Sequence, residues 1–148
     1  MTIKELIESI ALKHRDSGID IYAPAALADI TVFEQQMGFP LPTDFKEFYS
    51  MYNGFSCNED IFNIIPLSEI RRHPQDYGTN WFCFSEYMIY SDMWGLRFTS
   101  SGQHEIFNGS YPDIAMTSSL IEFLNRFLKG NVFDPGGLYE WHNELRIK

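Results

Sequence analysis

The chain has 148 residues, with 20 acidic and 11 basic side chains and a formal net charge of −9 at pH 7. Its apolar content of 45% and aromatic content of 16% exclude a disordered chain and allow a core without disulfides or metal. The negative field repels nucleic acid and anionic lipid and favours encounter with basic proteins, although it also serves solubility.

No apolar run reaches the length of a membrane span, and Glu5 and Glu8 interrupt the N-terminal apolar stretch. We therefore expect a cytoplasmic protein without a signal peptide or membrane contact. The only basic doublet is Arg71-Arg72, which is typical of surface arginines and does not predict direct nucleic-acid binding.

Apolar periodicity predicts three helices in the first third of the chain, the first of them over 3–14 and the second over 27–37. Two prolines then force a turn, because proline lacks the backbone donor and pushes the preceding residue to extended geometry. We expect Thr43 to cap the third helix, which should end at Asn53-Gly54. The helices therefore meet across a rigid Pro-Leu-Pro corner, with Leu41 packed between them.

Nine residues of this segment also share the order and spacing of a known signature. These residues are Glu34, Gly38, Leu41, Pro42, Phe45, Phe48, Tyr52, Asn53 and Gly54. With them the segment resembles the N-terminal part of the SUKH superfamily, which contains bacterial immunity proteins against polymorphic toxins and fungal cell-wall synthesis regulators. Each of them is also explained by capping, helix termination or packing, so the signature predicts architecture and no chemistry.

The middle of the chain is predicted to form a mostly antiparallel meander. A short β-rich run over 61–65 ends at a proline, and 73–80 is typical of a loop. Residues 81–99 are nearly all strand material, and over 94–99 Trp94, Leu96 and Phe98 alternate with other residues in the period of two of a half-buried strand. We expect two further strands, over 104–107 and 112–116, separated by a turn.

A capping box at Ser119 and Glu122 predicts a helix over 118–129, and a short terminal helix is expected over 138–145. The sequence thus predicts one α+β domain over 1–148, with a curved sheet flanked by N-terminal helices and a C-terminal helix. Its expected parts are a helical segment, a sheet and C-terminal helices; their boundaries are 1–55, 56–117 and 118–148.

No catalytic, cofactor-binding or metal-binding motif is found in the sequence. The four histidines are scattered, no phosphate-cradling glycine motif occurs, and Cys57 and Cys83 are expected to be reduced structural residues. An acid/base set is conceivable, but carboxylates at such positions are usually solvated. Its members would be Glu59, Asp60, Glu86, Asp92 and His104.

Aromatic and acidic residues between 59 and 113 are the candidates for partner binding, because aromatic side chains bury much area at small entropic cost. Most aromatics could equally be core, and for Trp81 and Tyr90 core packing is favoured. Tyr77 and Tyr111, in loops, are better interface candidates. The candidate set is Glu59, Asp60, Asp76, Tyr77, Glu86, Tyr87, Asp92, Trp94, Tyr111 and Asp113.

The resemblance implies a non-enzymatic immunity protein that neutralises a cognate toxin by occluding its active site. The acidic balance favours a basic toxin, such as one that attacks nucleic acid. Two alternatives remain: a regulatory scaffold for cell-wall synthesis or signalling proteins, and a small-ligand or hydrolytic enzyme. The sequence is compatible with a monomer or a weak dimer.

Overall fold

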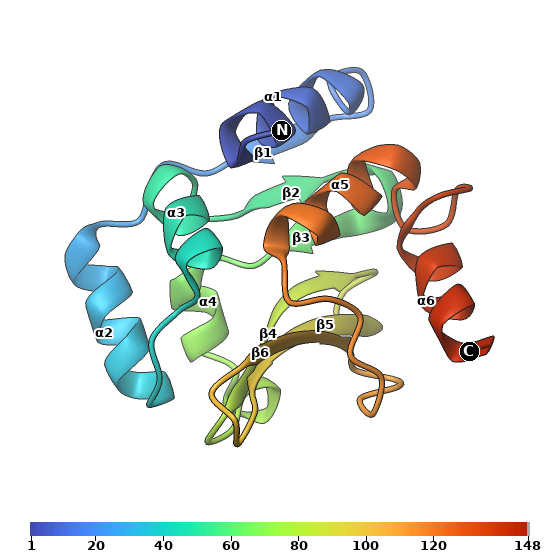
Figure 1. The fold of residues 1–148 in the computed structure, drawn as a ribbon. Helices are drawn as coiled ribbons and strands as arrows, with labels where there is room; N and C mark the ends of the chain where they lie inside the picture. The colour runs from blue at the N-terminus through green and yellow to red at the C-terminus, as the bar shows by residue number, and fades with distance from the viewer. Residues whose placement is uncertain (148) are drawn as a thin grey trace.

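The computed structural model describes residues 1–147 and shows a six-stranded antiparallel sheet in which each strand lies beside the previous one in the chain (Figure 1). This is the predicted meander. The strands are β1 (Ile19–Ile21), β2 (Phe55–Cys57), β3 (Phe62–Ile64), β4 (Trp81–Tyr87), β5 (Asp92–Phe98) and β6 (His104–Asn108).

Helices precede, interrupt and follow the strands, so the chain is a single α+β domain as predicted. They are α1 (Ile3–Lys13), α2 (Leu27–Met37), α3 (Thr43–Met51), α4 (Leu67–Arg71), α5 (Leu120–Gly130) and α6 (Leu138–Ile147), with 3₁₀ turns η1 (Glu59–Ile61) and η2 (Pro74–Asp76). Strands β1 and β2 and helix α4 were not predicted, because each is too short to show a periodicity.

The strand expected over 112–116 is not formed. Only a single bridge joins Ile106 to Thr117, with Met116 donating its N–H to the Ile106 carbonyl at 2.8 Å. Pro112 within the segment cannot donate to a ladder, which keeps the pairing to one point.

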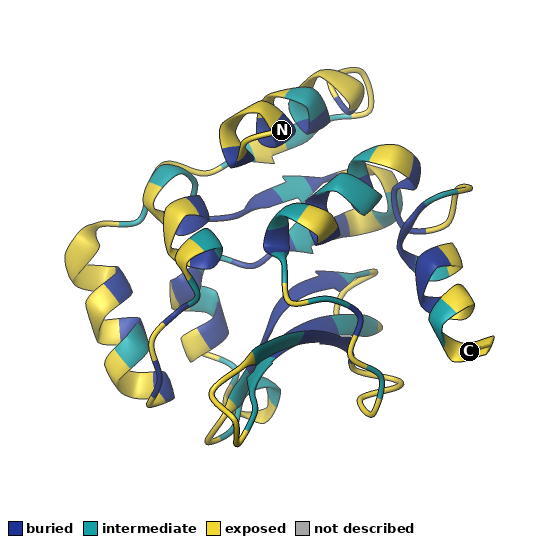
Figure 2. Cartoon of the chain, in the orientation of Figure 1, coloured by how far each residue is buried: buried dark blue, intermediate teal, exposed yellow. Residues whose placement is uncertain are grey.

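The sheet curls around helix α5, which lies between its β2–β3 part and its β4–β5 part (Figure 1). The ring of Phe127 stacks on that of Phe62, with ring centroids 4.1 Å apart. The Phe123 ring packs against Phe84 and Trp94, with centroid distances of 5.1 Å and 6.0 Å. Figure 2 shows that the buried positions gather on the strand and helix surfaces that face one another. The core is therefore on the inner side of the curl.

The Pro-Leu-Pro corner is held by a residue of the signature. Helix α2 ends at Gly38, whose φ of 84° is left-handed, and the Glu34 side chain accepts a hydrogen bond from the Leu41 N–H at 2.7 Å. Lys46 on the next helix lies 3.4 Å from the same carboxylate. Leu41 is buried between the helices, as predicted.

The start of α3 differs from the prediction, because Thr43 does not cap it. Pro42 occupies the cap position, and no side chain bonds there. Instead Asp44 accepts hydrogen bonds from its neighbour Phe45 at 2.8 Å and from the Leu120 N–H at 2.7 Å. Leu120 is the first residue of α5, so one carboxylate joins the N-termini of two helices distant in sequence.

We predict that Asp44→Ala lowers the free energy of unfolding by about 1–2 kcal/mol, because two backbone donors at helix starts lose their acceptor. Asp29→Ala is the matched control, since Asp29 is an exposed acidic residue in the first turn of α2. Its expected loss is below about 0.5 kcal/mol. Urea denaturation of both variants would contradict this account if the two losses were equal.

Candidate functional site

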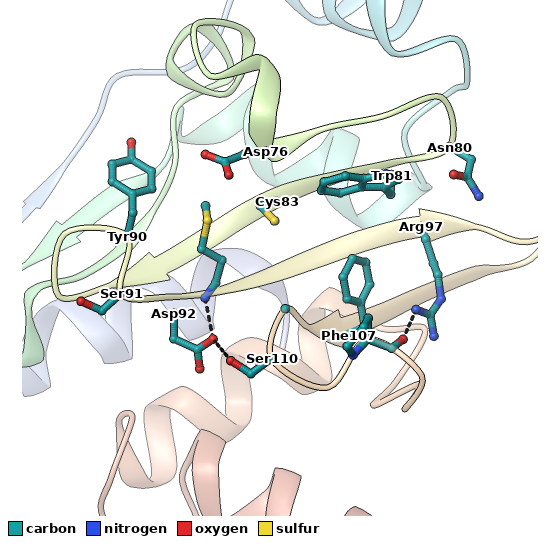
Figure 3. Close-up of a pocket in the computed structure, with 13 residues that line it drawn as sticks. Asp76, Asn80, Trp81, Cys83, Tyr90, Ser91, Asp92, Arg97, Phe107 and Ser110 are labelled. Carbon is teal, nitrogen blue, oxygen red and sulfur yellow. Dashed lines mark hydrogen bonds between the residues drawn. The ribbon is translucent and has the colours of Figure 1, made fainter.

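The outer face of strands β4 to β6, opposite α5, carries a cleft of about 510 Å³. Its lining comes from these three strands, the η2 segment, the β4–β5 turn and the loop at 109–112 (Figure 3). The outer positions follow from the strand alternation, because Trp94 and Leu96 point into the core while Met93 and Arg97 line the cleft.

The floor of the cleft is aromatic. Trp81 and Phe107 lie edge to face with ring centroids 6.5 Å apart. Gly95 pairs with Phe107 in the sheet, and a Cβ atom on Gly95 would lie 2.5 Å from the Phe107 Cζ. Glycine is therefore needed here, because any side chain would displace the ring from the floor.

Arg97 occupies one end of the cleft and is already paired. Its guanidinium carbon lies 4.8 Å from the centroid of Phe107, which is cation–π geometry. Its Nε donates to Glu105 at 2.8 Å, and an Nη donates to the Pro112 carbonyl. This end of the cleft is electrically balanced.

Asp92 lies at the other end and is held rigidly (Figure 3). One oxygen accepts from the Met93 N–H at 3.0 Å and from the Ser110 hydroxyl at 3.0 Å. The other accepts from Asn108 Nδ2 at 3.0 Å and from the Tyr139 hydroxyl. Four donors use its acceptor positions, so Asp92 provides fixed negative charge at the end of the cleft.

Asp76 faces the same cleft from η2 and has a different environment. Partial burial raises its pKa, which nearby His73 partly opposes. Within residues 1–147 no side chain donates a hydrogen bond to its carboxylate. Burial, and then the charges of Asp76 and Asp92, raise the pKa of the Cys83 thiol to about 12. Both carboxylates therefore act on one thiol at the floor of the cleft.

A second feature adjoins the cleft at one end of the sheet, where three loops meet (Figure 1). These loops, at 58–61, 88–91 and 131–137, are called the loop end here. They contain no Lys or Arg. Their exposed apolar side chains are Ile61 (43%), Met88 (51%), Ile89 (76%) and Phe133 (56%). Exposed apolar groups gathered in this way mark a contact surface.

Contacts between the loops hold the loop end together. Met88 donates its N–H to the Ile61 carbonyl at 3.1 Å, and the Phe133 ring lies edge to face with Tyr87 at 5.4 Å. Burial, and then the charge of Glu59, raise the pKa of Asp60 in the same region. The loop end is therefore apolar at its tips and acidic around them.

The β4–β5 turn has unusual backbone geometry. Met88, Ile89 and Tyr90 have backbone φ values of 55°, 55° and 61°. Residues other than Gly, Asn and Asp rarely adopt this left-handed conformation. The turn is stabilised by Glu86, whose carboxylate accepts the Tyr90 N–H at 2.6 Å. Strain of this kind concentrates at functional sites, and here it presents two apolar side chains to solvent.

Six of the ten predicted partner-binding residues lie at the surface. Asp76 and Asp92 line the cleft, Glu59 and Asp60 belong to the loop end, and Tyr111 and Asp113 are exposed beyond the end of β6. The Tyr111 ring is covered on one side by Arg146 at 4.0 Å.

The other four predicted residues are not available as expected. Trp94 is 0% exposed, because it lies on the inner face of β5, and Glu86 is buried by the turn that it holds. Tyr87 is half-buried beneath the loop end, and the Tyr77 hydroxyl accepts a hydrogen bond from Gln36 at 3.1 Å. The predictions that Trp94 and Glu86 bind a partner are wrong, because they did not consider whether each side chain points into the core or toward solvent.

The favoured core interpretation of Trp81 and Tyr90 is also wrong, since both line the cleft. The alternation of Phe82 and Phe84 toward the core was the available signal for Trp81. Nothing in the sequence marks Tyr90, whose position depends on the left-handed turn. Arg97 and Phe107 were missed as well, because their pairing depends on the β5–β6 register.

The conceivable acid/base set is dispersed. Asp92 lines the cleft, Glu86 borders a separate depression, and His104 borders a third, with a pKa lowered by burial. In the part of the chain that the structure describes, no three His, Cys, Asp or Glu residues are grouped to hold a metal ion. Nor is any helix within residues 1–147 long and apolar enough to span a membrane.

Fold and surface together define a single-domain α+β protein whose curled sheet is covered by helices on one face and carries an acidic, aromatic cleft on the other. The family model for the SMI1 / KNR4 family (SUKH-1) matches residues 24–126, well over half of the chain. The protein belongs to this family, as the resemblance predicted. No curated protein sequence gives a significant match. The matched range contains the signature and every strand from β2 to β6.

The strain in the β4–β5 turn can be measured. We predict that Ile89→Asn raises the free energy of unfolding by about 0.5–1 kcal/mol, because asparagine tolerates the left-handed conformation that a β-branched residue resists. Leu12→Asn, at an exposed position inside α1, is the control and should lower stability by about 0.5 kcal/mol. A destabilised Ile89→Asn variant would show that the turn is not strained.

Proposed function

We propose that the protein is a non-enzymatic, cytoplasmic binding protein of the immunity type, which neutralises a cognate basic toxin by covering its active site. The observation that carries the proposal is the continuous surface formed by the loop end and the cleft. Both share the β4–β5 turn, with Met88 and Ile89 at its tip and Tyr90 lining the cleft. Membership of the SMI1/KNR4 family supports a role in protein–protein interaction.

The composition of this surface resembles that of protein interfaces. Exposed apolar and aromatic side chains lie at its centre, and carboxylates surround them; such side chains carry most of the binding energy in protein complexes. The loop end contributes Glu59, Asp60 and Asp134, and the cleft contributes Asp76 and Asp92. Because the three loops contain no Lys or Arg, a basic partner meets attraction across the loop end.

The net charge of −9 adds a long-range effect. Toxin domains that act on nucleic acid carry basic surfaces, and an acidic inhibitor is steered toward them and matches the charge of their substrate. The dispersal of the acid/base set supports binding over catalysis, because Asp92 is saturated with donors and Glu86 is buried away from the cleft.

Co-expression tests the proposal. The protein should restore growth to cells that express the toxic domain encoded by the adjacent gene, and the two should elute together from a size-exclusion column. The triple variant Ile61→Ser, Met88→Ser, Ile89→Ser should weaken the complex at least about tenfold, because the apolar centre of the interface is removed.

A control variant replaces exposed apolar residues on the helical side, namely Leu12→Ser, Leu27→Ser and Val32→Ser, and should bind as the unmodified protein does. Circular dichroism of both variants establishes that they are folded. Growth arrest despite co-expression, without a complex, would reject the immunity function. Equal weakening by both triple variants would reject the loop end as the contact surface.

A further inference from the structure

The two ends of the cleft differ in charge although they share one aromatic floor. At one end Arg97 stacks on Phe107 and is neutralised by Glu105. At the other end Asp76 and Asp92 face the same space, and no Lys or Arg of residues 1–147 lies within ion-pair distance of either carboxylate. The cleft therefore has an unbalanced negative end.

The two carboxylates have different capacities at that end. Asp92 already accepts four hydrogen bonds, so it contributes charge and little else. Asp76 has free acceptor positions and is half-buried, in surroundings where an ionic hydrogen bond is stronger than in water. The Cys83 thiol between them stays neutral at physiological pH, because its pKa is raised to about 12. A cation entering there meets two carboxylates and no Lys or Arg, and His73 is the basic group nearest to Asp76.

The aromatic side chain at this end favours a flat cation. Tyr90 lines the cleft away from Trp81 and Arg97, and its ring centroid lies 5.1 Å from that of His73 (Figure 3). Guanidinium groups stack on aromatic faces and pair with carboxylates in a fork, whereas an ammonium group is a more strongly hydrated point charge. The pair formed by Arg97 and Phe107 shows this mode within the same cleft.

We propose that the negative end of the cleft receives an arginine side chain of the partner protein, stacked on Tyr90 and hydrogen-bonded to Asp76. This inference rests on the proposed function and names the partner group that the cleft recognises. The volume of about 510 Å³ is ample for one such side chain. A second copy of this chain is a poor occupant, because two surfaces with the same carboxylates repel one another.

The test uses small probes in place of a partner. N-acetyl-arginine amide is titrated into the ¹⁵N-labelled protein, and the backbone amide signals of Asp76 and Tyr90 are followed. We expect a saturable shift with a Kd of about 1–10 mM, the range for one ion pair with stacking. The neutral analogue N-acetyl-citrulline amide should not bind, and N-acetyl-lysine amide should bind at least about threefold more weakly.

Variants locate the site. Asp76→Asn keeps the shape of the side chain and should weaken arginine binding at least about fivefold. It should unfold at the same temperature as the original protein or higher, since burial already disfavours the charge of Asp76. Asp29→Asn, at an exposed position on α2 outside the cleft, is the control and should bind normally.

Equal binding of arginine and citrulline amides, or full binding by Asp76→Asn, would overturn the inference. Equal binding of the lysine amide would overturn its preference for arginine. These results are independent of the proposed function, because they require no toxin. A toxin complex that tolerates Asp76→Asn would reject the arginine site while leaving the immunity function intact.

Discussion

One-sided burial of the curled sheet is the constraint on which the rest of this structure depends. Helix α5 lies inside the curl, where Phe123 and Phe127 contact rings from β3, β4 and β5. Successive side chains of a strand point to opposite faces of the sheet. A residue whose side chain enters this core is therefore followed by one whose side chain lies on the outer face. The cleft is the result, since outer positions of β4 to β6 are not covered by a helix.

Local polar contacts at the helix ends hold the elements in this arrangement. Glu34 holds the corner between α2 and α3, and Asn53 accepts the N–H of Leu67 at 3.1 Å, where α4 begins. Asp44 joins the starts of α3 and α5. Such bonds satisfy helix-end donors that would otherwise be buried without partners. The signature residues Glu34 and Asn53 thus belong to a rigid support that lies apart from the cleft and the loop end.

The surface, by contrast, contains strain and unbalanced charge. Three consecutive left-handed residues expose Met88 and Ile89, and Asp76 is partly buried without a cation. Both features reduce the stability of the isolated protein, and contact with the apolar, basic partner that we propose would compensate both.

The sequence by itself determined the α+β class, the meander, the Pro-Leu-Pro corner, and the Ser119 cap, whose hydroxyl accepts the Glu122 N–H at 3.1 Å. Those features depend on neighbours within a few residues. Tertiary structure alone decided that Trp94 is core, that Tyr90 lines a cleft, and that Asp44 reaches α5. The reason is physical: register, strand side and helix packing join residues far apart in the chain, where local periodicity carries no information.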